Sequence, residues 1–386
     1  MTDMKVSKDI AYIGANDYKI KLFESQYELE KGMAYNSYLI KDEKNAILDT
    51  IDENVTDKWL ENLEKELNGE KPDYLVISHL EPDHAYNIGL VAEKYPEMKI
   101  VGNQITFNML QNFFKIENLA ERKVVVMEGD VLDLGKHKLQ FIMAPMIHWP
   151  EVMMSYEQTE KILFSADAFG KFGTTDADED WDCEARRYYF GIVGKYGMQV
   201  QNILKKVASL DVKMICPLHG PILKENLGYY INKYDIWSSY KPEEEGIMIA
   251  VASIHGNTMK AAKKLEEILK NTVKEKVVLV DLAREDWAES VEDAFRYSKL
   301  ILMASSYNMG VFPPMEYFLN HLKDRNYQNR KIAIIENGSW APSAAKCMKN
   351  IIEDMKNIEL VDNVITIKST MSEKNIQEFE NLAKKI

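Results

Sequence analysis

The stretch Ser78-His79-Leu80-Glu81-Pro82-Asp83-His84 indicates most about this chain, because four side chains that can bind a metal lie within six residues. It follows the apolar run 74–77, which is typical of a buried strand, and precedes 85–90, which can begin a helix. A turn between a strand and a helix can direct neighbouring side chains at one point, whereas a strand would send them to opposite faces. Two imidazoles and two carboxylates in such a turn predict a metal site with more than one ion.

Three further candidate ligands, His148, Asp167 and His219, each follow a strand-like apolar segment. Sheet-based folds present their site residues on such loops. Seven ligands suit two metal ions that share a carboxylate and keep positions open for a small molecule. We expect one ion to be bound by His79, Glu81 and His148. We expect the other to be bound by Asp83, His84 and His219, with Asp167 between the two ions.

A single histidine is more often a structural group than a ligand, so the clustered string carries this prediction. The remaining histidines, His137, His255 and His321, receive no metal role. His137 stands in a Lys-His-Lys turn and is expected to be solvated.

Composition limits the classes of function. The length of 386 residues allows two or three domains, and the net charge of −13 argues against a nucleic-acid partner. Cys183, Cys216 and Cys347 form no C-x-x-C pair, which excludes an iron–sulfur or rubredoxin-type site within this chain; we expect each to serve ordinary packing. Sparse cysteines, no signal-peptide pattern and no membrane-length apolar stretch predict a cytoplasmic protein without a membrane partner.

Segment 238–246 combines a proline, a run of like charge and a glycine, and therefore predicts a linker. Before it, many short β-segments with fewer helices predict a layered α/β sandwich; strands are expected at 33–40, 46–48, 74–77, 99–101, 124–127 and 139–143, and helices at 55–67 and 105–114. After it, five strand–helix units predict a doubly wound parallel sheet. Its strands are expected at 247–252, 277–280, 300–304, 331–335 and 361–367, and its helices at 257–269, 291–297, 315–322, 344–355 and 376–385. The predicted domains are 1–240 and 247–386.

Three loops follow strands of the second domain. The first offers hydroxyls, a glycine and a helix N-terminus, which can bind a phosphate with neutral donors, and it lacks the lysine of a Walker loop. His255 in this loop could donate to the phosphate or be solvent-exposed. The other two loops carry the aromatic residues Tyr307 and Trp340, which could contribute to a binding site or could merely cap the sheet. The candidate binding residues are Ser253, Ile254, His255, Gly256, Asn257 and Thr258; Ser305, Ser306, Tyr307, Asn308, Met309 and Gly310; Asn337, Gly338, Ser339, Trp340 and Ala341.

The H-x-E-x-D-H string, with His148, Asp167 and His219, resembles the metallo-β-lactamase fold. Hydrolases of that fold usually carry a histidine where this chain has Glu81. With Glu81 and a flavodoxin-like second half, the chain resembles over essentially its whole length the flavodiiron proteins (A-type flavoproteins), and all seven ligand positions match. This resemblance implies an N-terminal metallo-β-lactamase-like αββα sandwich and a C-terminal flavodoxin-like doubly wound sheet.

The resemblance further implies two iron ions on the seven ligands and FMN on the three loops, with Trp340 as a stacking partner of the flavin ring. It implies an enzyme that reduces dioxygen to water, and possibly nitric oxide to nitrous oxide, with electrons relayed through FMN from an external donor. A rubredoxin or a reduced deazaflavin coenzyme is the expected donor, and a head-to-tail homodimer or a dimer of dimers the expected assembly. Tyr196 resembles a family position near the substrate pocket. Glu81 as a hard anionic donor suits iron or manganese.

Three alternatives stay open. The first is a nitric oxide reductase of the same family. The second is a zinc-dependent hydrolase with an accessory flavodoxin-like domain, which Glu81 disfavours. The third is an electron carrier whose metals are only structural, which open coordination positions disfavour. The sequence does not choose between dioxygen and nitric oxide, identify the donor, distinguish dimer from tetramer, or show which residues set gas selectivity.

Overall fold

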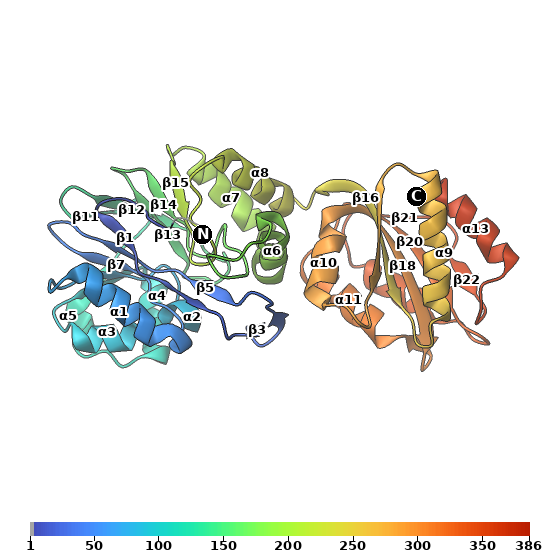
Figure 1. Ribbon diagram of the computed structural model, residues 1–386, viewed down its shortest axis with the longest axis horizontal. Coiled ribbons are helices and arrows are strands. Elements are labelled where there is room, and N and C mark those ends of the chain that lie inside the picture. The colour runs from blue at the N-terminus through green and yellow to red at the C-terminus, as the bar shows by residue number, and fades with distance from the viewer. Residues whose placement is uncertain (1–3) are drawn as a thin grey trace. The chain divides into compact units, whose positions relative to one another are not determined.

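The computed structural model describes residues 4–386, which form two compact units (Figure 1). The first unit comprises the residues up to Tyr189 together with Met198–Tyr234. The second comprises Phe190–Gly197 together with Asp235–Ile386. The limits inferred from the sequence place residues 190–197 with the first domain; as limits of folding domains they remain a prediction.

The first unit is built on two sheets that face each other. The six-stranded sheet has the order β1-β6-β7-β8-β9-β10, with strands Ile10–Tyr12, Tyr38–Ile40, Ala46–Leu48, Tyr74–Val76, Lys99–Gly102 and Lys123–Val125. The five-stranded sheet runs in the order β11 to β15, with strands Val131–Asp133, Lys138–Met143, Met153–Glu157, Ile162–Phe164 and Met214–Cys216. Apolar side chains of both sheets, such as Leu48 and Phe141, share one buried core. This is the predicted sandwich.

Helices cover both faces of the sandwich. Its helices are α1 to α8, with bounds Thr56–Leu67, Pro82–Ala85, Ile88–Lys94, Gln104–Phe113, Leu119–Arg122, Trp181–Tyr188, Gly197–Val207 and Leu227–Ser238. Figure 1 shows α1, α3 and α5 on the side of the first sheet, and α6 and α7 on the side of the second. Two small hairpin sheets pair β2 with β5 and β3 with β4, with bounds Ala15–Asp17, Met33–Tyr35, Leu22–Phe23 and Tyr27–Glu28.

The second unit is a doubly wound parallel sheet with the strand order β17-β16-β18-β20-β21. Off this order, β22 pairs in parallel with β20, and β19 pairs antiparallel with β18. Strands β16 to β22 span Glu244–Ala252, Lys276–Asp281, Tyr297–Tyr307, Gly310–Val311, Arg330–Asn337, Ile358–Leu360 and Ile365–Ile367. Helices α9 to α13 span Asn257–Thr272, Trp287–Arg296, Pro313–Asp324, Ala344–Ile352 and Glu373–Ala383. In Figure 1, α9 and α13 lie on one face of the sheet and α10 and α11 on the other.

Several predicted elements have different limits in the structure. The predicted strand 33–40 is interrupted at Asn36 and Ser37, because Asn36 Nδ2 donates to the carbonyls of Pro217 and Gly220, both at 2.9 Å. Of the predicted strand 361–367 only β22 forms, at its end, and β21 lies just before the predicted range. The hydrogen bonds of Asn36 join segments that are far apart in the sequence, and periodicity does not reveal them.

Helix α10 begins four residues earlier than predicted. Asp286 caps it by accepting a hydrogen bond from the backbone of Ala288 at 3.0 Å. The helix ends at Arg296, and Tyr297, which was predicted to be helical, begins strand β18. An aspartate N-cap is a sequence signal for a helix start, and here it was overlooked.

His137 corrects a sequence-based expectation, because its side chain is fully buried rather than solvated. The lysines on either side of it are exposed, and they made the turn look hydrophilic.

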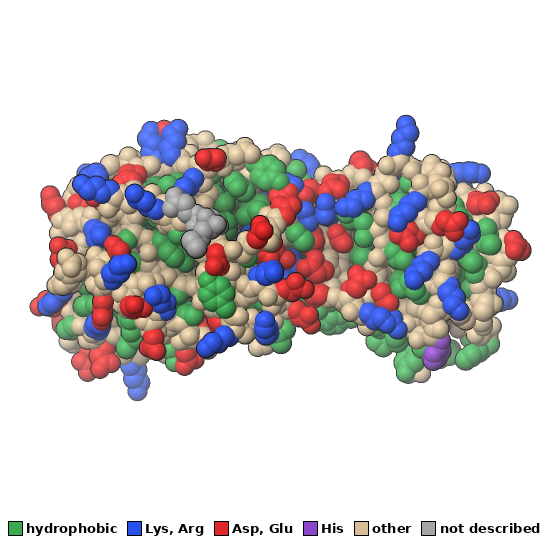
Figure 2. All heavy atoms as spheres, viewed as in Figure 1, with side chains coloured by type: hydrophobic (Ala, Val, Ile, Leu, Met, Phe, Trp, Pro, Cys, Tyr) green, Lys and Arg blue, Asp and Glu red, His purple; other side chains and the backbone are tan. Residues whose placement is uncertain are grey.

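Exposed charged groups of both signs are interspersed over the face shown in Figure 2. Within residues 4–386, no helix combines the length and the apolar character that a membrane crossing requires.

Candidate functional site

The string at residues 78–84 forms the turn after strand β8 and the first residues of helix α2, so it lies where a strand leads into a helix, as predicted. Asp49, at the end of β7, holds this turn: its Oδ1 accepts a hydrogen bond from the backbone N–H of Ser78 at 2.7 Å. Burial raises the pKa of the Asp49 carboxyl to about 6, and the hydrogen bonds from Ser78 oppose that rise. Pro82 is the first residue of α2, where its fixed φ and missing N–H fit a helix start.

The first group of candidate ligands converges on one point. His148 Nε2 lies 2.9 Å from Glu81 Oε2, and His79 Nε2 lies 3.3 Å from the same oxygen. The two imidazole Nε2 atoms are 3.3 Å apart. Asp167 Oδ2 completes the group at 3.3 Å from His79 Nε2 and 3.4 Å from His148 Nε2. Two atoms that each lie about 2.1 Å from one ion are roughly 3.0 to 3.4 Å apart, so these spacings match a coordination shell.

The second group has the same spacings. His84 Nε2 lies 3.0 Å from His219 Nε2 and 3.3 Å from Asp83 Oδ2. His219 Nε2 lies 3.2 Å from the same carboxylate oxygen. The other oxygen of Asp167, Oδ1, lies 3.2 Å from His84 Nε2. Asp167 therefore presents one oxygen to each group, which is the geometry of a bridging carboxylate.

Unsatisfied polar atoms indicate what the two groups lack. Within the described residues, all four carboxylate oxygens of Asp83 and Asp167 are buried without a hydrogen-bond partner. Facing Nε2 atoms of two neutral imidazoles cannot both accept or both donate. Buried charges of this kind occur when they are paired or coordinate metals. A cation between each set of ligand atoms removes both problems, so the residues present fit two metal ions.

The two aspartates have opposite electrostatic surroundings. Burial raises the pKa of Asp83 to about 7; the imidazole of His84 opposes this shift, and Glu81 adds to it. Burial alone would also raise the pKa of Asp167, but the imidazoles of His79 and His148 hold that pKa well below its usual range. Asp167, in contact with imidazoles of both groups, is therefore the residue best suited to stay anionic between two cations.

Glu151 is a functional residue that the sequence reasoning missed. Its fully buried carboxylate lies 2.8 Å from His79 Nδ1 and accepts a hydrogen bond from the backbone of Leu80 at 2.9 Å. His219 Nδ1 is similarly placed 2.8 Å from the carbonyl of Ala34. Partners on the far nitrogen fix the tautomer and ring orientation of metal-binding histidines. The available signal was proximity, since Glu151 follows His148 by three residues.

Aromatic rings enclose the second group. Phe23, Tyr35 and Tyr188 place their rings 5.5, 5.8 and 5.5 Å from the imidazole of His219. Tyr196, which was predicted near the substrate pocket, lies in the 3-10 turn Gly194–Tyr196 and clusters with the second unit. Its pocket role stays a prediction.

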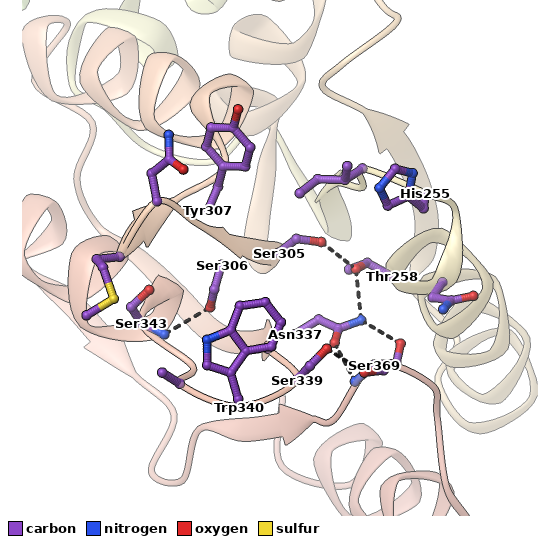
Figure 3. Close-up of a pocket in the computed structure, with 16 residues that line it drawn as sticks. His255, Thr258, Ser305, Ser306, Tyr307, Asn337, Ser339, Trp340, Ser343 and Ser369 are labelled. Carbon is purple, nitrogen blue, oxygen red and sulfur yellow. Dashed lines mark hydrogen bonds between the residues drawn. The ribbon is translucent and has the colours of Figure 1, made fainter.

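The three predicted loops of the second unit line one pocket of about 570 Å³ (Figure 3). Every predicted binding residue contributes to its lining except Ser253, Gly256 and Gly310. Ser343 and Ser369 also line it and were not predicted. The side chain of Trp340 is 90% exposed, and Figure 3 shows it alongside the labelled polar groups of the pocket. A large aromatic face left open to solvent beside a cavity can stack on a planar ligand.

Neutral hydrogen bonds hold the pocket loops together. Asn337 Nδ2 donates to Thr258 Oγ1 at 3.2 Å and to the carbonyl of Ser369 at 3.1 Å, and its Oδ1 accepts from the Ser369 backbone at 3.0 Å. Thr258 and Ser305 share a hydroxyl hydrogen bond of 2.9 Å. Asn337 thus joins the segment that carries Ser369 to the loop at residues 253–258.

Helix α9 begins at this pocket without a side-chain cap. Its N-cap, Gly256, has a φ of +89°, in the left-handed region that glycine tolerates best. Ser253 Oγ accepts hydrogen bonds from the backbones of Gly256 and Met259 at 3.1 and 3.3 Å and fixes the loop. A helix N-terminus beside hydroxyl groups fits a phosphate. The pocket therefore fits a flat ring with a phosphate-bearing side chain.

Comparisons with known proteins cover both units of the chain. A family model described as ODP family beta lactamase matches residues 33–220. An anaerobic nitric oxide reductase flavorubredoxin of Vibrio vulnificus is 28% identical over 87% of this chain and 70% of its own length. Rubredoxin oxygen:oxidoreductase from Desulfovibrio gigas matches with a TM-score of 0.90 at 24% identity, over 98% of this chain and 96% of its own. The flavodiiron protein from Giardia intestinalis matches with a TM-score of 0.92 at 22% identity, over 99% and 95%.

Proposed function

Because this chain belongs to the flavodiiron proteins, which it resembles in sequence and in fold, we propose that it is an oxidoreductase that reduces dioxygen to water. The observation that supports this most is the bridging position of Asp167, with one oxygen toward each of two ligand groups. Two metals held by these seven residues would supply the redox chemistry that reduction of a small diatomic molecule needs.

The cofactors of this family are a diiron centre and FMN, and the residues of both sites fit them. When bound, iron supplies one-electron redox chemistry and FMN supplies one- or two-electron transfer. We assign one iron to His79, Glu81 and His148, the other to Asp83, His84 and His219, and Asp167 to both. We assign FMN to the three pocket loops, with its phosphate at the start of α9 and its ring beside Trp340.

The protein's own residues would then have distinct tasks. The carboxylates of Glu81, Asp83 and Asp167 offset the positive charge of two oxidised metals. Glu151 orients the imidazole of His79 through its Nδ1 atom. Aromatic rings around His219 exclude water from one side of the site.

Nitric oxide is the second candidate substrate. It is favoured by the similarity to the Vibrio vulnificus protein, whose name is anaerobic nitric oxide reductase flavorubredoxin. Dioxygen is favoured by electron count, because its reduction to two waters takes four electrons and four protons, and two one-electron metals with one flavin hold four electrons.

Anaerobic stopped-flow separates the two substrates. The iron- and FMN-loaded protein is fully reduced and mixed with dioxygen or with nitric oxide, and the flavin and iron absorbance are followed. Faster oxidation by dioxygen is the expected result. Faster oxidation by nitric oxide would assign the second substrate. Slow reaction with both gases would overturn the proposal and favour the electron carrier, and zinc in place of iron in the purified protein would favour the hydrolase.

We also propose an external donor, a rubredoxin or a reduced deazaflavin coenzyme, and a head-to-tail homodimer or a dimer of dimers in which the flavin of one subunit serves the metals of another. Mixing two inactive variants tests the assembly: Asp83→Ala impairs the metal site, and a variant unable to bind FMN impairs the pocket. Recovered turnover after subunit exchange is the expected result. Two variants that stay inactive in mixed dimers would exclude electron transfer between subunits.

A further inference from the structure

A second cluster of metal-binding side chains lies outside the site described above. It consists of Asp9, His137 and Glu160, whose ligand atoms lie within 4.8 Å of one another. His137 Nε2 is 3.7 Å from Asp9 Oδ2 and 3.9 Å from Glu160 Oε1. These separations are too long for hydrogen bonds but only a few tenths of an ångström longer than ligand spacings around one cation.

The cluster contains a buried imidazole that lacks hydrogen-bond partners among the described residues. His137 is 0% exposed, and neither of its ring nitrogens makes a hydrogen bond within the described residues. Glu157 Oε1 lies 3.1 Å from Nδ1, without hydrogen-bond alignment. An imidazole buried without a partner on either nitrogen is costly. A cation at Nε2 would satisfy one nitrogen directly, and a small ring rotation would align the other with Glu157.

His137 repeats the arrangement of His79. In both residues Nδ1 faces a fully buried glutamate, Glu151 for His79 and Glu157 for His137. In both, Nε2 faces a carboxylate oxygen from another segment of the chain, that of Asp167 for His79 and that of Asp9 for His137. A carboxylate behind the imidazole and oxygen ligands in front of it is the usual arrangement of a metal-binding histidine.

The cluster is separate from the dinuclear site. His137 immediately precedes strand β12, whereas His148 follows it. A strand of six residues spans roughly 20 Å, so the two sites lie toward opposite ends of the second sheet. We propose that Asp9, His137 and Glu160 bind one divalent cation of the zinc class, independently of the dinuclear centre. One nitrogen and two carboxylate oxygens suit Zn²⁺ with the fourth position open.

Such an ion would join three segments. Asp9 directly precedes β1 in the six-stranded sheet, while His137 and Glu160 lie in the β11–β12 and β13–β14 turns of the five-stranded sheet. Ser7 already links the first and last segments, because its hydroxyl donates to Glu160 Oε1 at 3.1 Å. The ion would therefore hold the two sheets of the sandwich together at one edge.

Lys136 competes for this site. Its ammonium group contacts Asp9 Oδ2, the same oxygen that would bind the ion. The carboxylates of Asp9 and Glu160 are 29% and 26% exposed, so the ion has access from solvent. Removal of the Lys136 charge should tighten metal binding, which is a change in the direction opposite to that of a ligand substitution.

The test is a zinc titration of the protein loaded with iron and FMN, with an indicator dye for free Zn²⁺ and with elemental analysis of iron and zinc. Wild type should bind one zinc ion per chain without loss of iron. Glu160→Gln should weaken zinc binding at least about tenfold, and Lys136→Gln should strengthen it. The matched control is Asp133→Asn, an exposed acid paired with Lys138 at 2.9 Å near the same turn, which should not change zinc affinity.

A second readout uses stability. Zinc should raise the unfolding temperature of wild type and leave that of Glu160→Gln unchanged, because only a folded site binds the ion. Iron content and gas turnover should be the same in both proteins. Wild type without an additional zinc ion, or Glu160→Gln with wild-type zinc affinity, would overturn the proposal. Zinc that binds only as iron is lost would show exchange into the dinuclear site and would overturn it too.

Discussion

The seven candidate metal ligands of the first unit are mostly buried and rich in charge, whereas the pocket of the second unit is open and lined mainly by neutral polar groups. In the cluster, Asp167 and His84 are 1% exposed. In the pocket, Trp340 is 90% exposed, and Asn337 holds loops through amide hydrogen bonds. Buried ligands have no water to replace a lost partner, so one substitution in the cluster should cause a large loss of metal binding. One substitution in the open pocket should cause only a small loss of ligand affinity.

The largest effect is expected from Asp167→Asn. The substitution keeps the shape of the side chain but removes the charge that faces both ligand groups. Iron content should fall at both positions, and gas turnover should be abolished, with FMN still bound. Metal analysis, flavin absorbance and turnover measure the three quantities. If this variant keeps two irons and wild-type turnover, the buried cluster does not depend on the charge of Asp167.

Two further variants test whether the two ligand groups bind metal separately. Asp83→Ala and His148→Ala each remove a ligand from one group only, so each should abolish gas reduction while FMN stays bound. Iron loss should be smaller than in Asp167→Asn, because one group remains complete. Equal loss of both irons in all three variants would show that the two groups do not bind metal separately.

Glu151→Gln should have an intermediate effect. Glu151 touches His79 rather than the metal position, and loss of its charge should weaken iron binding or turnover about 10- to 100-fold. Glu128→Gln is the control, since this exposed glutamate pairs with Lys206 at 2.6 Å and should leave both unchanged. If Glu151→Gln also changes nothing, orientation of His79 does not depend on this carboxylate.

Trp340→Ala tests the open pocket. Loss of one aromatic stacking contact should weaken FMN binding by about 1 kcal/mol, roughly fivefold in Kd, and slow electron entry. Trp340→Phe keeps an aromatic face and should restore most of the affinity. Iron content should be unchanged in both. Flavin affinity and potential identical to wild type in the alanine variant would remove the proposed role of Trp340.

The smallest effect concerns acid sensitivity of the second unit. Burial and the nearby charge of Arg325 lower the pKa of His321 to about 4, and Arg325 Nη1 lies 2.8 Å from His321 Nδ1. Because the folded pKa is below the unfolded value, stability from the neutral imidazole is complete above about pH 6.5 and is lost as the pH falls toward 4.

Hydrogen exchange in helix α11, corrected for the intrinsic pH dependence, measures this loss. Protection should fall between pH 6.5 and 4 in wild type and remain flatter in His321→Gln. His255→Gln is the control, since His255 is exposed at the pocket and should leave the profile unchanged. A profile that instead follows His255 would place the acid sensitivity in the pocket.

The sequence indicated the cluster of candidate metal ligands because four of them are close together in the chain. His79, Glu81, Asp83 and His84 occupy one strand-to-helix turn, where local geometry alone brings side chains together. The pocket loops were predicted for a related reason, since each follows a strand of a parallel sheet and such ends meet at one edge. Their assignment to iron and to FMN remains our proposal.

What the sequence did not provide is a set of contacts between distant segments. Ser369 reaches the pocket only because β22 lies beside β20, and Glu151 reaches His79 across 72 residues. His137 looked solvated between two lysines, yet packing of the two sheets buries it among Glu157, Asp9 and Glu160.

The amino-acid sequence by itself thus determined the fold class, and it predicted a two-part organisation and the candidate ligands that share a turn, since these follow from periodicity and local geometry. Only the tertiary structure decided which oxygen of Asp167 faces which group, which carboxylate supports each histidine and which histidine is buried. Those properties depend on the separation and dielectric surroundings of groups far apart in the chain, and one-dimensional patterns do not contain them.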